Sequence, residues 1–495
     1  MKDPLKQTLL ARVYDVAKET PLQRAAKLSQ QTGVQVYLKR EDLQPVHSFK
    51  LRGAYNKMVN LTEEEKTKGV IAASAGNHAQ GVALAAKKLG VSAVIVMPTT
   101  TPAIKIDAVK SYGAEAVLIG DSYTDAFDHA QKLMDKSGRT FVHPFDDPLV
   151  ITGQGTIGRE LLEQLPDTTH IFVPVGGGGL IAGIAQFVKG IRPDVKIIGV
   201  EPEDANAMQL SLKAGKRVTL EHVGIFADGV AVKQVGALNF QIAQQYVDEV
   251  MTVNTDQICA AIKSVFEDTR SIVEPAGALA TAGMQQYALP KGAKVVTICS
   301  GANVTFERLQ QIAERTLIGS GKEALFAVTM PEKPGALRTF CTDVVNGHSI
   351  TEFNYRLNER AGAHILVGIS IANEAGKEAF MAKMKKHEYQ HVNLSTDDIA
   401  KEHVRHMIGG PSPATEHMYQ FDFPERPGAL GDFLAAVGTK WNISAFHYRG
   451  AASDTGNVLI GFEATDKKTL EAILNQTGCT WQSVDTNPSM KVFLK

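Results

Sequence analysis

The strongest constraint on the fold is a segment that occurs twice in the second half of the chain. Met330-Pro-Glu-Lys-Pro-Gly-Ala-Leu337 recurs 93 residues later as Phe423-Pro-Glu-Arg-Pro-Gly-Ala-Leu430, and Ile350 to Arg356 recurs at the same offset as Ile443 to Arg449. A third pair of apolar blocks keeps this offset. Because unrelated stretches do not preserve loop lengths through three blocks, the second half contains two copies of one domain.

Each copy predicts the same order of elements: a strand, a Pro-Gly turn into a helix, two strands, a helix and a final strand. This order is the ferredoxin-like βαββαβ pattern of a small α+β domain. With 495 residues, the chain is long enough for several such cores. We expect a first region at residues 1–321, the two copies at 322–397 and 417–495, and a helix with a Gly-Pro-rich linker at 398–416.

The first region alternates short apolar runs with helical segments. Strand-like runs lie at residues 70–73, 93–97, 171–173, 196–200 and 294–298. Near-continuous apolar strands separated by helices predict an α/β region whose mostly parallel sheets are covered on both faces. Ligands of such folds bind beyond the carboxyl ends of the strands, so the loops there are the candidate ligand sites.

Charge and composition exclude several classes of function. A formal net charge of −1 provides no electrostatic footprint for nucleic acid or anionic membranes. The four cysteines are far apart in the sequence and form neither a metal-binding pair nor a disulfide framework, which suits a reducing compartment. The N-terminus lacks the apolar core of a signal peptide, and proline and glycine interrupt the apolar stretch 168–188. We expect a cytoplasmic protein with small-molecule partners, no metal site, and no nucleic-acid or membrane partner.

Three loops follow predicted strands and carry unusual residues. Ser74-Ala-Gly-Asn-His78 offers small residues, backbone N–H groups and one amide, which suit the close approach of a carboxylate or a ring. Gly176-Gly-Gly-Gly-Leu180 opens an apolar helix, and four glycines at a helix N-terminus are typical of a phosphate-binding loop. Ser300-Gly-Ala-Asn303 places a hydroxyl at the mouth of the same sheet. Each loop taken alone is also compatible with an ordinary tight turn.

A lysine lies at the start of the chain's first long predicted helix. Lys50 follows the apolar run Val36-Tyr-Leu38 and its charged exit Lys39-Arg-Glu-Asp42. It lies between Phe49 and Leu51, where partial desolvation lowers the pKa of an amine toward nucleophilic use in a Schiff base. In isolation, one of the chain's many solvated lysines is the simpler interpretation.

Two kinds of cofactor compete for these loops. Gly177-x-Gly179-x-x-Ala182, with Glu201 at the end of the next strand, matches a dinucleotide-binding pattern and would make the chain an oxidoreductase. That pattern leaves Lys50, Asn77 and Ser300 without roles. A phosphorylated aldehyde uses all of them, with the lysine for the aldehyde, the glycines for the phosphate and the serine for a ring nitrogen. Pyridoxal 5'-phosphate is therefore the better account.

Four segments carry a family resemblance. Gln44 to Tyr55, Ser74 to Gly81, Gly176 to Leu180 and Ser300 to Asn303 closely resemble, in order and in context, the threonine dehydratases. These enzymes belong to the tryptophan-synthase-β-like class of pyridoxal phosphate enzymes, known as fold type II. The resemblance implies that fold for the first region, with catalysis by a bound pyridoxal phosphate.

The resemblance also implies a role for each candidate residue. Lys50 is expected to be the Schiff-base lysine and the general base, and Ser300 to face the pyridine nitrogen. His47 and His78 are neighbouring alternatives as bases, but Lys50 is the simpler choice. Asn77 is expected to contact the ring hydroxyl. The phosphate is expected to be held by Gly176, Gly177, Gly178, Gly179 and Leu180, and the substrate carboxylate by Ser74, Ala75, Gly76, Asn77 and His78.

The implied reaction is the dehydration and deamination of L-threonine to 2-oxobutanoate and ammonia, the committed step toward isoleucine. A serine dehydratase or racemase of the same fold is the nearest competitor. The sequence does not rank threonine over L-serine, because one methyl group in an apolar pocket is worth only about 1–3 kcal/mol.

The duplicated domains resemble the ACT-like regulatory domains of biosynthetic threonine dehydratases. That resemblance implies inhibition by isoleucine, modulation by valine and a homotetramer, with effector contacts at Tyr355, Tyr448 and Arg449. Phe353 and Phe446 alternate with the two tyrosines onto one strand face, and core packing is the competing explanation for these aromatics.

The two copies differ within the same blocks. His447 replaces Asn354 and Ala445 replaces Glu352. The two sites therefore need not bind the same ligand equally.

Overall fold

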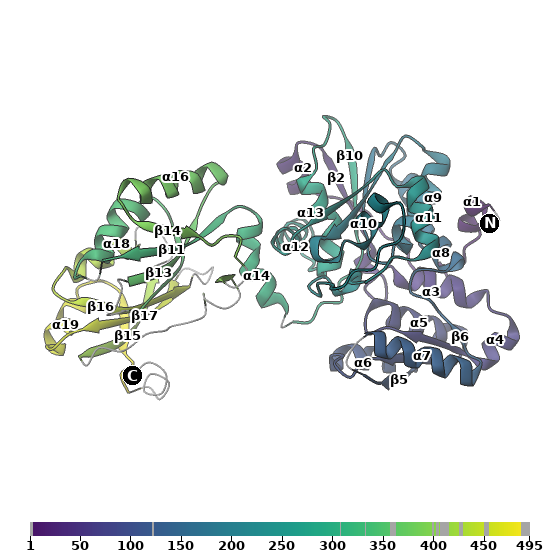
Figure 1. Cartoon of the computed structure of the whole chain (residues 1–495), viewed down its shortest axis with the longest axis horizontal. Coiled ribbons are helices and arrows are strands. Elements are labelled where there is room, and N and C mark those ends of the chain that lie inside the picture. Colours follow the sequence, from purple (N-terminus) through teal and green to yellow (C-terminus); the bar gives the residue numbers. More distant parts are fainter. Residues whose placement is uncertain are drawn as a thin grey trace. The chain divides into compact units, whose positions relative to one another are not determined.

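The computed structural model describes residues 3–120, 123–306, 308–331, 333–356, 363–397, 400–401, 405, 415–424, 429–449 and 455–486. It contains two compact units, Met1–Thr316 and Leu317–Lys495 (Figure 1). Most of the expected helix and linker at 398–416 lies outside the described residues.

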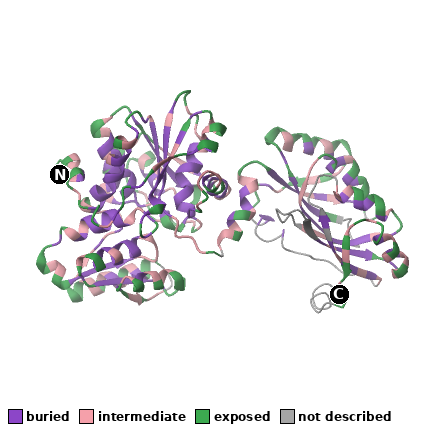
Figure 2. Cartoon of the chain, turned by 180° about the vertical axis from the view of Figure 1, so that it is seen from behind, coloured by how far each residue is buried: buried purple, intermediate pink, exposed green. Residues whose placement is uncertain are grey.

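The first unit contains a six-stranded sheet that carries most of the candidate loops. Its order is β1-β2-β10-β7-β8-β9, and all neighbours run parallel except β1, which is antiparallel to β2. Helices lie on both faces of this sheet, and its strands are largely buried (Figure 2). The strands are β1 (Leu22–Arg24), β2 (Gln35–Arg40), β7 (His170–Pro174), β8 (Lys196–Pro202), β9 (Glu249–Val253) and β10 (Lys294–Cys299).

A smaller parallel sheet of order β5-β4-β3-β6 completes the first unit. Alternate residues of β3 (Val70–Ala73) and β4 (Ala93–Met97) enter two different hydrophobic cores, because successive side chains point to opposite faces. One core is shared with α5 (Asn77–Leu89) and the other with α7 (Tyr123–Ser137). The remaining strands are β5 (Glu115–Leu118) and β6 (Thr140–Phe141).

The other helices of the first unit follow the predicted alternation with strands. Helices α5 and α9 begin two residues before the segments predicted from the sequence, since α5 starts at Asn77 and α9 starts at Gly179. These helices are α1 (Pro4–Leu9), α2 (Ala26–Thr32), α3 (Lys50–Val59), α4 (Glu63–Lys68), α6 (Ala103–Ser111), α8 (Pro148–Gln164), α9 (Gly179–Ile191), α10 (Ala207–Ala214), α11 (Ala237–Tyr246), α12 (Thr255–Thr269), α13 (Pro275–Gln286) and α14 (Arg308–Gly319), which continues into the second unit.

The second unit has the predicted βαββαβ order twice. Its two four-stranded halves join edge to edge into one sheet of order β14-β11-β13-β12-β16-β17-β15-β18. The first copy contains β11 (Glu323–Met330), α15 (Ala336–Phe340), η4 (Cys341–Val345), β12 (Ile350–Arg356), β13 (Ala363–Ser370), α16 (Glu374–Lys386) and β14 (Gln390–Asn393). The second contains β15 (Glu416–Pro424), α18 (Ala429–Val437), β16 (Asn442–Arg449), β17 (Thr455–Glu463), α19 (Lys467–Leu474) and β18 (Thr480–Ser483).

The junction of the two copies is an antiparallel pair of strands. β12 pairs with β16 so that Asn354 lies opposite His447, its own counterpart in the repeat. One hydrophobic core runs under both halves and includes Phe353, Tyr355 and Phe446. The differences seen in the sequence have a structural reason here, because Glu352 forms a buried ion pair with Arg405 at 2.5 Å and Ala445 has no carboxylate to do so.

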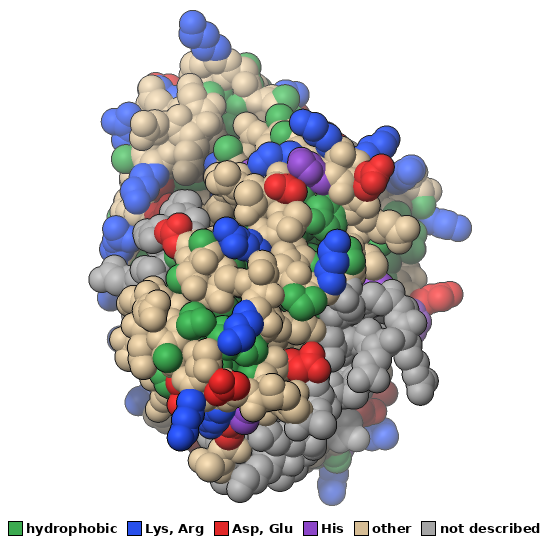
Figure 3. Space-filling model, turned by 90° about the vertical axis from the view of Figure 1, so that its left-hand side faces the viewer, with side chains coloured by type: hydrophobic (Ala, Val, Ile, Leu, Met, Phe, Trp, Pro, Cys, Tyr) green, Lys and Arg blue, Asp and Glu red, His purple; other side chains and the backbone are tan. Residues whose placement is uncertain are grey.

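The surface of the second unit mixes charges of both signs. Figure 3 shows Lys and Arg side chains interspersed with Asp and Glu over the described part of one face. Among the described residues, no helix combines the length and the apolar composition needed to cross a membrane.

Candidate active site

Lys50 is the first residue of α3 and is partly buried. Its Nζ donates a hydrogen bond to the carbonyl of Pro144 at 3.1 Å and lies 5.3 Å from the centre of the Phe49 ring. Burial lowers the pKa of this amine to about 8, against the opposing charge of Glu274. The expected desolvation is confirmed, and it makes the neutral, nucleophilic amine accessible near physiological pH.

The loop after β10 is bonded directly to the segment before Lys50. The Phe49 N–H donates to the Ser300 carbonyl at 3.1 Å, and the Ala302 N–H donates to the His47 carbonyl at 2.9 Å. The Ser300 hydroxyl is buried and donates to the carbonyl of Ala276 at 3.2 Å. Parallel pairing of β2 with β10 brings these loops together at one sheet edge.

The glycine loop turns from β7 into α9. Gly178 is the N-cap of α9 and has φ 90°, a conformation that favours glycine. A Cβ atom at Gly176 would lie 2.8 Å from the Cα of Val230, so a larger residue would clash with backbone. The glycines therefore allow a tight turn and a close approach to the N-terminus of α9, where N–H groups point outward along the helix dipole.

Asn239 on α11 holds this loop in place. Its Nδ2 donates to the carbonyls of Gly177 at 2.8 Å and Phe145 at 3.0 Å, and the Gly236 N–H also donates to Gly177 at 3.0 Å. With its carbonyl bound on the protein side, the loop presents N–H groups rather than carbonyl oxygens to an anion.

These groups line one cavity, although they come from distant parts of the sequence. Lys50, Asn77, the loop from Gly176 to Leu180, and Ser300 all contribute to it. Other walls come from Phe49, Phe145, Pro174, Gly229, Val230, Glu274 and Ala276. An amine, an anion-binding helix N-terminus and a buried hydroxyl in one cavity fit the aldehyde, phosphate and ring nitrogen of pyridoxal phosphate.

The rest of the loop after β3 does not line this cavity. Ser74, Ala75, Gly76 and His78 lie outside its walls, and the Ser74 hydroxyl accepts the Gly76 N–H at 3.2 Å. His78 is buried, its Nε2–H donates to the Val142 carbonyl at 2.8 Å, and burial lowers its pKa to about 3. His78 is thus neutral and bound to backbone, while His47 is exposed, so neither histidine displaces Lys50 as the candidate base.

Comparison with known proteins agrees with this geometry. Residues 13–301 match the family of pyridoxal-phosphate dependent enzymes, and residues 314–404 and 410–494 match the C-terminal regulatory domain of threonine dehydratase. A biosynthetic L-threonine dehydratase of Burkholderia multivorans is 50% identical over 99% of both chains. The chain belongs to the threonine dehydratase family. The biosynthetic L-threonine dehydratase of Escherichia coli strain K12 is 49% identical, over 99% of this chain and 96% of its own.

Solved structures also resemble this chain over part of its length. The processed form of threonine deaminase isoform 2 from Solanum lycopersicum has a TM-score of 0.61 and 53% identity, covering 63% of this chain and 92% of its own. Maize serine racemase has a TM-score of 0.59 and 34% identity, covering 63% and 97%. The chain is a pyridoxal-phosphate-dependent lyase, and its predicted fold class is confirmed.

The dinucleotide interpretation is wrong for this dehydratase, and Glu201 shows why. Its two carboxylate oxygens accept the backbone N–H groups of Met208 and Gln209, both at 2.8 Å. The residue is buried, and burial raises its pKa to about 8. Glu201 therefore caps the start of α10, which occupies the oxygens that a ribose would need.

Sequence reasoning missed Glu274, a buried acid of the same cavity. The Asn77 Nδ2 donates to Glu274 Oε1 at 2.6 Å, and the Asn77 Oδ1 accepts the Nδ2–H of Asn303 at 2.6 Å. These two bonds fix which end of the Asn77 amide faces which neighbour. Burial raises the pKa of Glu274 to about 7. The available sequence signal was the step Glu274-Pro275 at a helix start.

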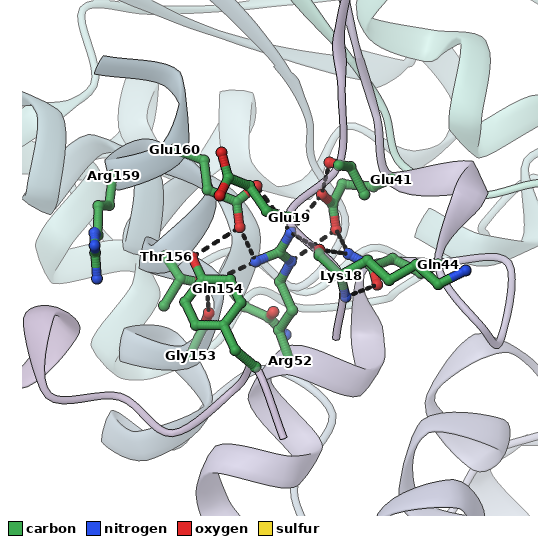
Figure 4. Close-up of polar contacts among 12 residues, drawn as sticks. Lys18, Glu19, Glu41, Gln44, Arg52, Gly153, Gln154, Thr156, Arg159 and Glu160 are labelled. Atoms are coloured by element: carbon green, nitrogen blue, oxygen red, sulfur yellow. Dashed lines mark hydrogen bonds and ion pairs between the residues drawn. The ribbon is translucent and has the colours of Figure 1, made fainter. Parts of the chain in front are cut away.

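The charged residues after Val36-Tyr-Leu38 are all buried. Figure 4 shows the cluster around Arg52, two residues after Lys50. Arg52 pairs with Glu41 at 2.8 Å and with Glu160 at 2.6 Å, and Glu160 also pairs with Lys39 at 2.6 Å. Two cations and two anions balance each other, which is the condition for burying charge. The cluster anchors the start of α3 to β2 and α8.

Proposed function

We propose that this threonine dehydratase converts L-threonine to 2-oxobutanoate and ammonia, and that it accepts L-serine as a second substrate. The observation that carries the proposal is the meeting of the Lys50 amine, the glycine loop and the Ser300 hydroxyl in one cavity. The similar dehydratases named above are called biosynthetic, which supports a role at the committed step toward isoleucine.

Each residue of the cavity has a separate task. Bound pyridoxal phosphate supplies a conjugated ring that withdraws electrons from Cα of the attached substrate. Lys50 then removes the Cα proton as general base, since its lowered pKa leaves a usable fraction of neutral amine. The glycine loop from Gly176 to Leu180 would hold the phosphate, and Asn77, which is held by Glu274 and Asn303, would contact the ring hydroxyl.

Ser300 would face the ring nitrogen of bound pyridoxal phosphate and would place a neutral hydroxyl there. A hydroxyl does not hold a pyridine nitrogen protonated as a carboxylate would, which would favour β-elimination over transamination. We assign the substrate carboxylate to the N–H groups of residues 74–78 at the start of α5.

The second unit regulates the first through amino-acid effectors. Isoleucine inhibits and valine modulates, with Tyr355 and Tyr448 as effector contacts. Tyr355 is buried in the core of the unit and Tyr448 is half-buried. The side chain of Arg449 lies outside the described part of the chain, so its assignment rests on resemblance alone. We further propose a cytoplasmic homotetramer, with domain limits at 1–321, 322–397 and 417–495.

The test is an assay of 2-oxo acid formation from threonine and from serine, with and without isoleucine. We expect product from both substrates and inhibition by isoleucine. Borohydride reduction of the holoenzyme followed by peptide mapping should place the cofactor label on Lys50. A label on another lysine would overturn the assignment of the site, and a lack of oxo acid would overturn the reaction.

A further inference from the structure

The turn that follows β6 carries the hydrogen-bond acceptor of the Lys50 amine. Lys50 Nζ donates to the carbonyl of Pro144 at 3.1 Å, and Pro144 lies between His143 and Phe145. A main-chain carbonyl moves only with its peptide group, so the contacts that fix this turn also fix the position of the acceptor.

The ring of His143 closes the turn. Its Nδ1 atom accepts the backbone N–H of Phe145 at 3.2 Å and that of Asp146 at 2.8 Å. An imidazole nitrogen that accepts hydrogen bonds carries no hydrogen, so the neutral ring has its hydrogen on Nε2. The two bonds run to the second and third residues after the histidine, as those of Asn and Asp side chains do in turns.

His143 and Lys50 bind opposite sides of one peptide group. The carbonyl of Pro144 and the N–H of Phe145 belong to the same trans peptide, in which these two groups point in opposite directions. His143 holds the N–H, and the carbonyl on the other side faces the Lys50 amine. The histidine therefore sets the direction of the carbonyl without touching the lysine side chain.

The surroundings of His143 keep its ring neutral. Burial lowers the pKa of His143 below its usual value and the charge of Lys50 acts in the same direction, while Asp146 and Asp147 oppose them. His78 on α5 is a further titratable neighbour, and burial keeps it neutral as well. Because the pKa of Lys50 is about 8, His143 remains an acceptor while the lysine gains or loses its proton.

The rest of the turn is anchored to the glycine loop and to α11. The carbonyl of Phe145 accepts the Nδ2–H of Asn239 at 3.0 Å, and a Cβ atom at Gly177 would overlap the Phe145 ring. The carboxylate of Asp146 accepts the first two backbone N–H groups of α11 at 2.8 and 2.9 Å. The acceptor of Lys50 thus has a fixed place relative to the glycine loop.

We propose that His143 is a positioning residue of the dehydratase reaction. By binding the peptide between Pro144 and Phe145, it directs a carbonyl that holds one hydrogen of the free Lys50 amine. That bond limits the directions in which the amine can present its lone pair, and a general base acts only on a proton within its reach. This inference rests on the proposed role of Lys50 as general base and adds the residue that orients it.

Three substitutions of His143 separate positioning from packing. His143→Leu keeps a side chain of similar bulk without the acceptor, so kcat for threonine should fall by about 10- to 100-fold. The KM should change by less than about threefold, because the base is misplaced only after the substrate has bound. His143→Asn keeps an acceptor for the same two N–H groups and should recover most of the lost kcat.

His143→Gln is the matched control for the asparagine variant. Its acceptor lies one bond further from the backbone, so it should behave like His143→Leu. The exposed His222 provides a second control, since His222→Leu should have the kcat and KM of the wild type.

Labelling of Lys50 in the apoenzyme gives a readout that does not depend on turnover. Trinitrobenzenesulfonate reacts with neutral amines, and peptide mapping measures its rate at Lys50. The carbonyl of Pro144 favours the ammonium form of Lys50, so loss of this bond should raise the labelling rate near neutral pH. The increase in His143→Leu should be about 2- to 10-fold, as one lost hydrogen bond implies, and His143→Asn should label like the wild type.

Wild-type kcat or wild-type labelling in His143→Leu would overturn the proposal, as would equal defects in the leucine and asparagine variants. If His143→Leu does not fold, the comparison of the asparagine and glutamine variants decides the question. A wild type that forms no oxo acid would refute the proposed reaction, while the labelling rates would still show whether His143 fixes the acceptor of Lys50.

Discussion

The sites of the catalytic and regulatory units are formed in different ways. In the catalytic unit, each candidate group has a fixed neighbour, as Asn77 has in Glu274 and Asn303, and Gly177 has in Asn239. In the regulatory unit, two copies share one order of elements, and cavities at corresponding places in the repeat have volumes of about 270 Å³ and about 30 Å³. Variants of the first unit should therefore lose activity or stability, and variants of the second should change the response to effectors.

Lys50→Ala tests the catalytic unit most directly and should have the largest effect. It should lower threonine turnover by at least about 10³-fold, since it removes both the general base and the cofactor attachment. Initial rates and the visible absorption of the holoenzyme measure the two losses. Lys66→Ala, which removes a half-buried lysine of α4 that pairs with the exposed Glu63, should be indistinguishable from wild type. A turnover in Lys50→Ala within tenfold of wild type would refute the role of Lys50.

Arg52→Met tests whether the catalytic unit depends on its buried charges. It leaves Glu41 and Glu160 without their shared cation, so the free energy of unfolding should fall by about 3–5 kcal/mol. Urea denaturation measures this change. The matched control is Lys68→Met, which breaks the exposed pair with Glu64 and should lower the free energy of unfolding far less, because solvent screens this pair. Equal effects of the two variants would contradict the anchoring role of the cluster.

The stability that this cluster contributes should change with pH in a defined direction. Arg52 holds the pKa of the buried Glu41 below its usual value, despite burial, which acts in the opposite direction. A carboxyl group whose pKa is lower in the folded state adds stability above its unfolded pKa and loses it as the pH falls through the folded pKa. Wild-type stability should therefore fall on acidification below about pH 4.5, and Arg52→Met should show a smaller fall.

Gly178→Asp tests the anion-binding loop. A side chain at φ 90° is strained, a Cβ there would lie 2.7 Å from the Met208 methyl, and a carboxylate would repel the phosphate. Cofactor affinity should fall by about 10- to 100-fold, as a strain of about 1–3 kcal/mol implies. Fluorescence titration of apoenzyme with pyridoxal phosphate measures it. Gly178→Ala separates strain from charge and should have the smaller effect, while Gly90→Ala, at a similar φ with no close neighbour, should leave affinity unchanged.

The fold was largely predictable, because its strongest signals repeat along the chain. Three blocks at one offset predicted both βαββαβ domains, and apolar runs predicted strands such as β3 and β4. Lys50 was correctly expected at a helix start and in a desolvated place. The glycines were also informative, since close packing against Phe145 and Val230 excludes larger residues at those positions.

The remaining features depend on which distant residues meet in space. Lys39 and Glu41 have charged side chains, and their burial is explained only by their partners, which are Glu160 on α8 for Lys39 and Arg52 on α3 for Glu41. Glu274 lies almost 200 residues from Asn77, its partner, so no local pattern marks it. In the regulatory unit, Trp441 has the same apolar character as many core residues. Its place in the wall of the smaller regulatory cavity follows only from the fold.

The tyrosines of the two copies test the regulatory half of the comparison. Tyr448 lines a cavity of about 270 Å³ in the regulatory unit. Because Tyr448 is a proposed effector contact, Tyr448→Leu should raise the isoleucine concentration for half-maximal inhibition by about 5- to 50-fold, within the usual range of allosteric coupling. Tyr355→Leu should raise it by a smaller factor, because the cavity beside Tyr355 has a volume of only about 30 Å³ and the ring also packs in the core of the unit. Initial rates over a series of isoleucine concentrations, at a fixed threonine concentration, measure the shift in both variants. Equal shifts would indicate two equivalent effector sites.

Substitution of Glu274 should produce the smallest effect on turnover, because this residue acts on its neighbours rather than on the substrate. Glu274→Gln keeps an acceptor for the Asn77 amide, so turnover should stay within about threefold of wild type. Glu274→Leu removes the acceptor and should lower kcat by about tenfold, because an unpaired buried amide costs about 1–3 kcal/mol.

Glu274→Gln should also change the pH dependence of kcat, because it removes the charge of Glu274. When ionised, above its pKa of about 7, Glu274 raises the pKa of Lys50. Removing that charge in Glu274→Gln should lower the pKa of the Lys50 amine, so more of it is neutral at a given pH. The rising limb of kcat against pH, which reports groups in the enzyme–substrate complex, should move to lower pH by less than about one unit. A shift to higher pH would show that Glu274 acts on Lys50 by some means other than its charge.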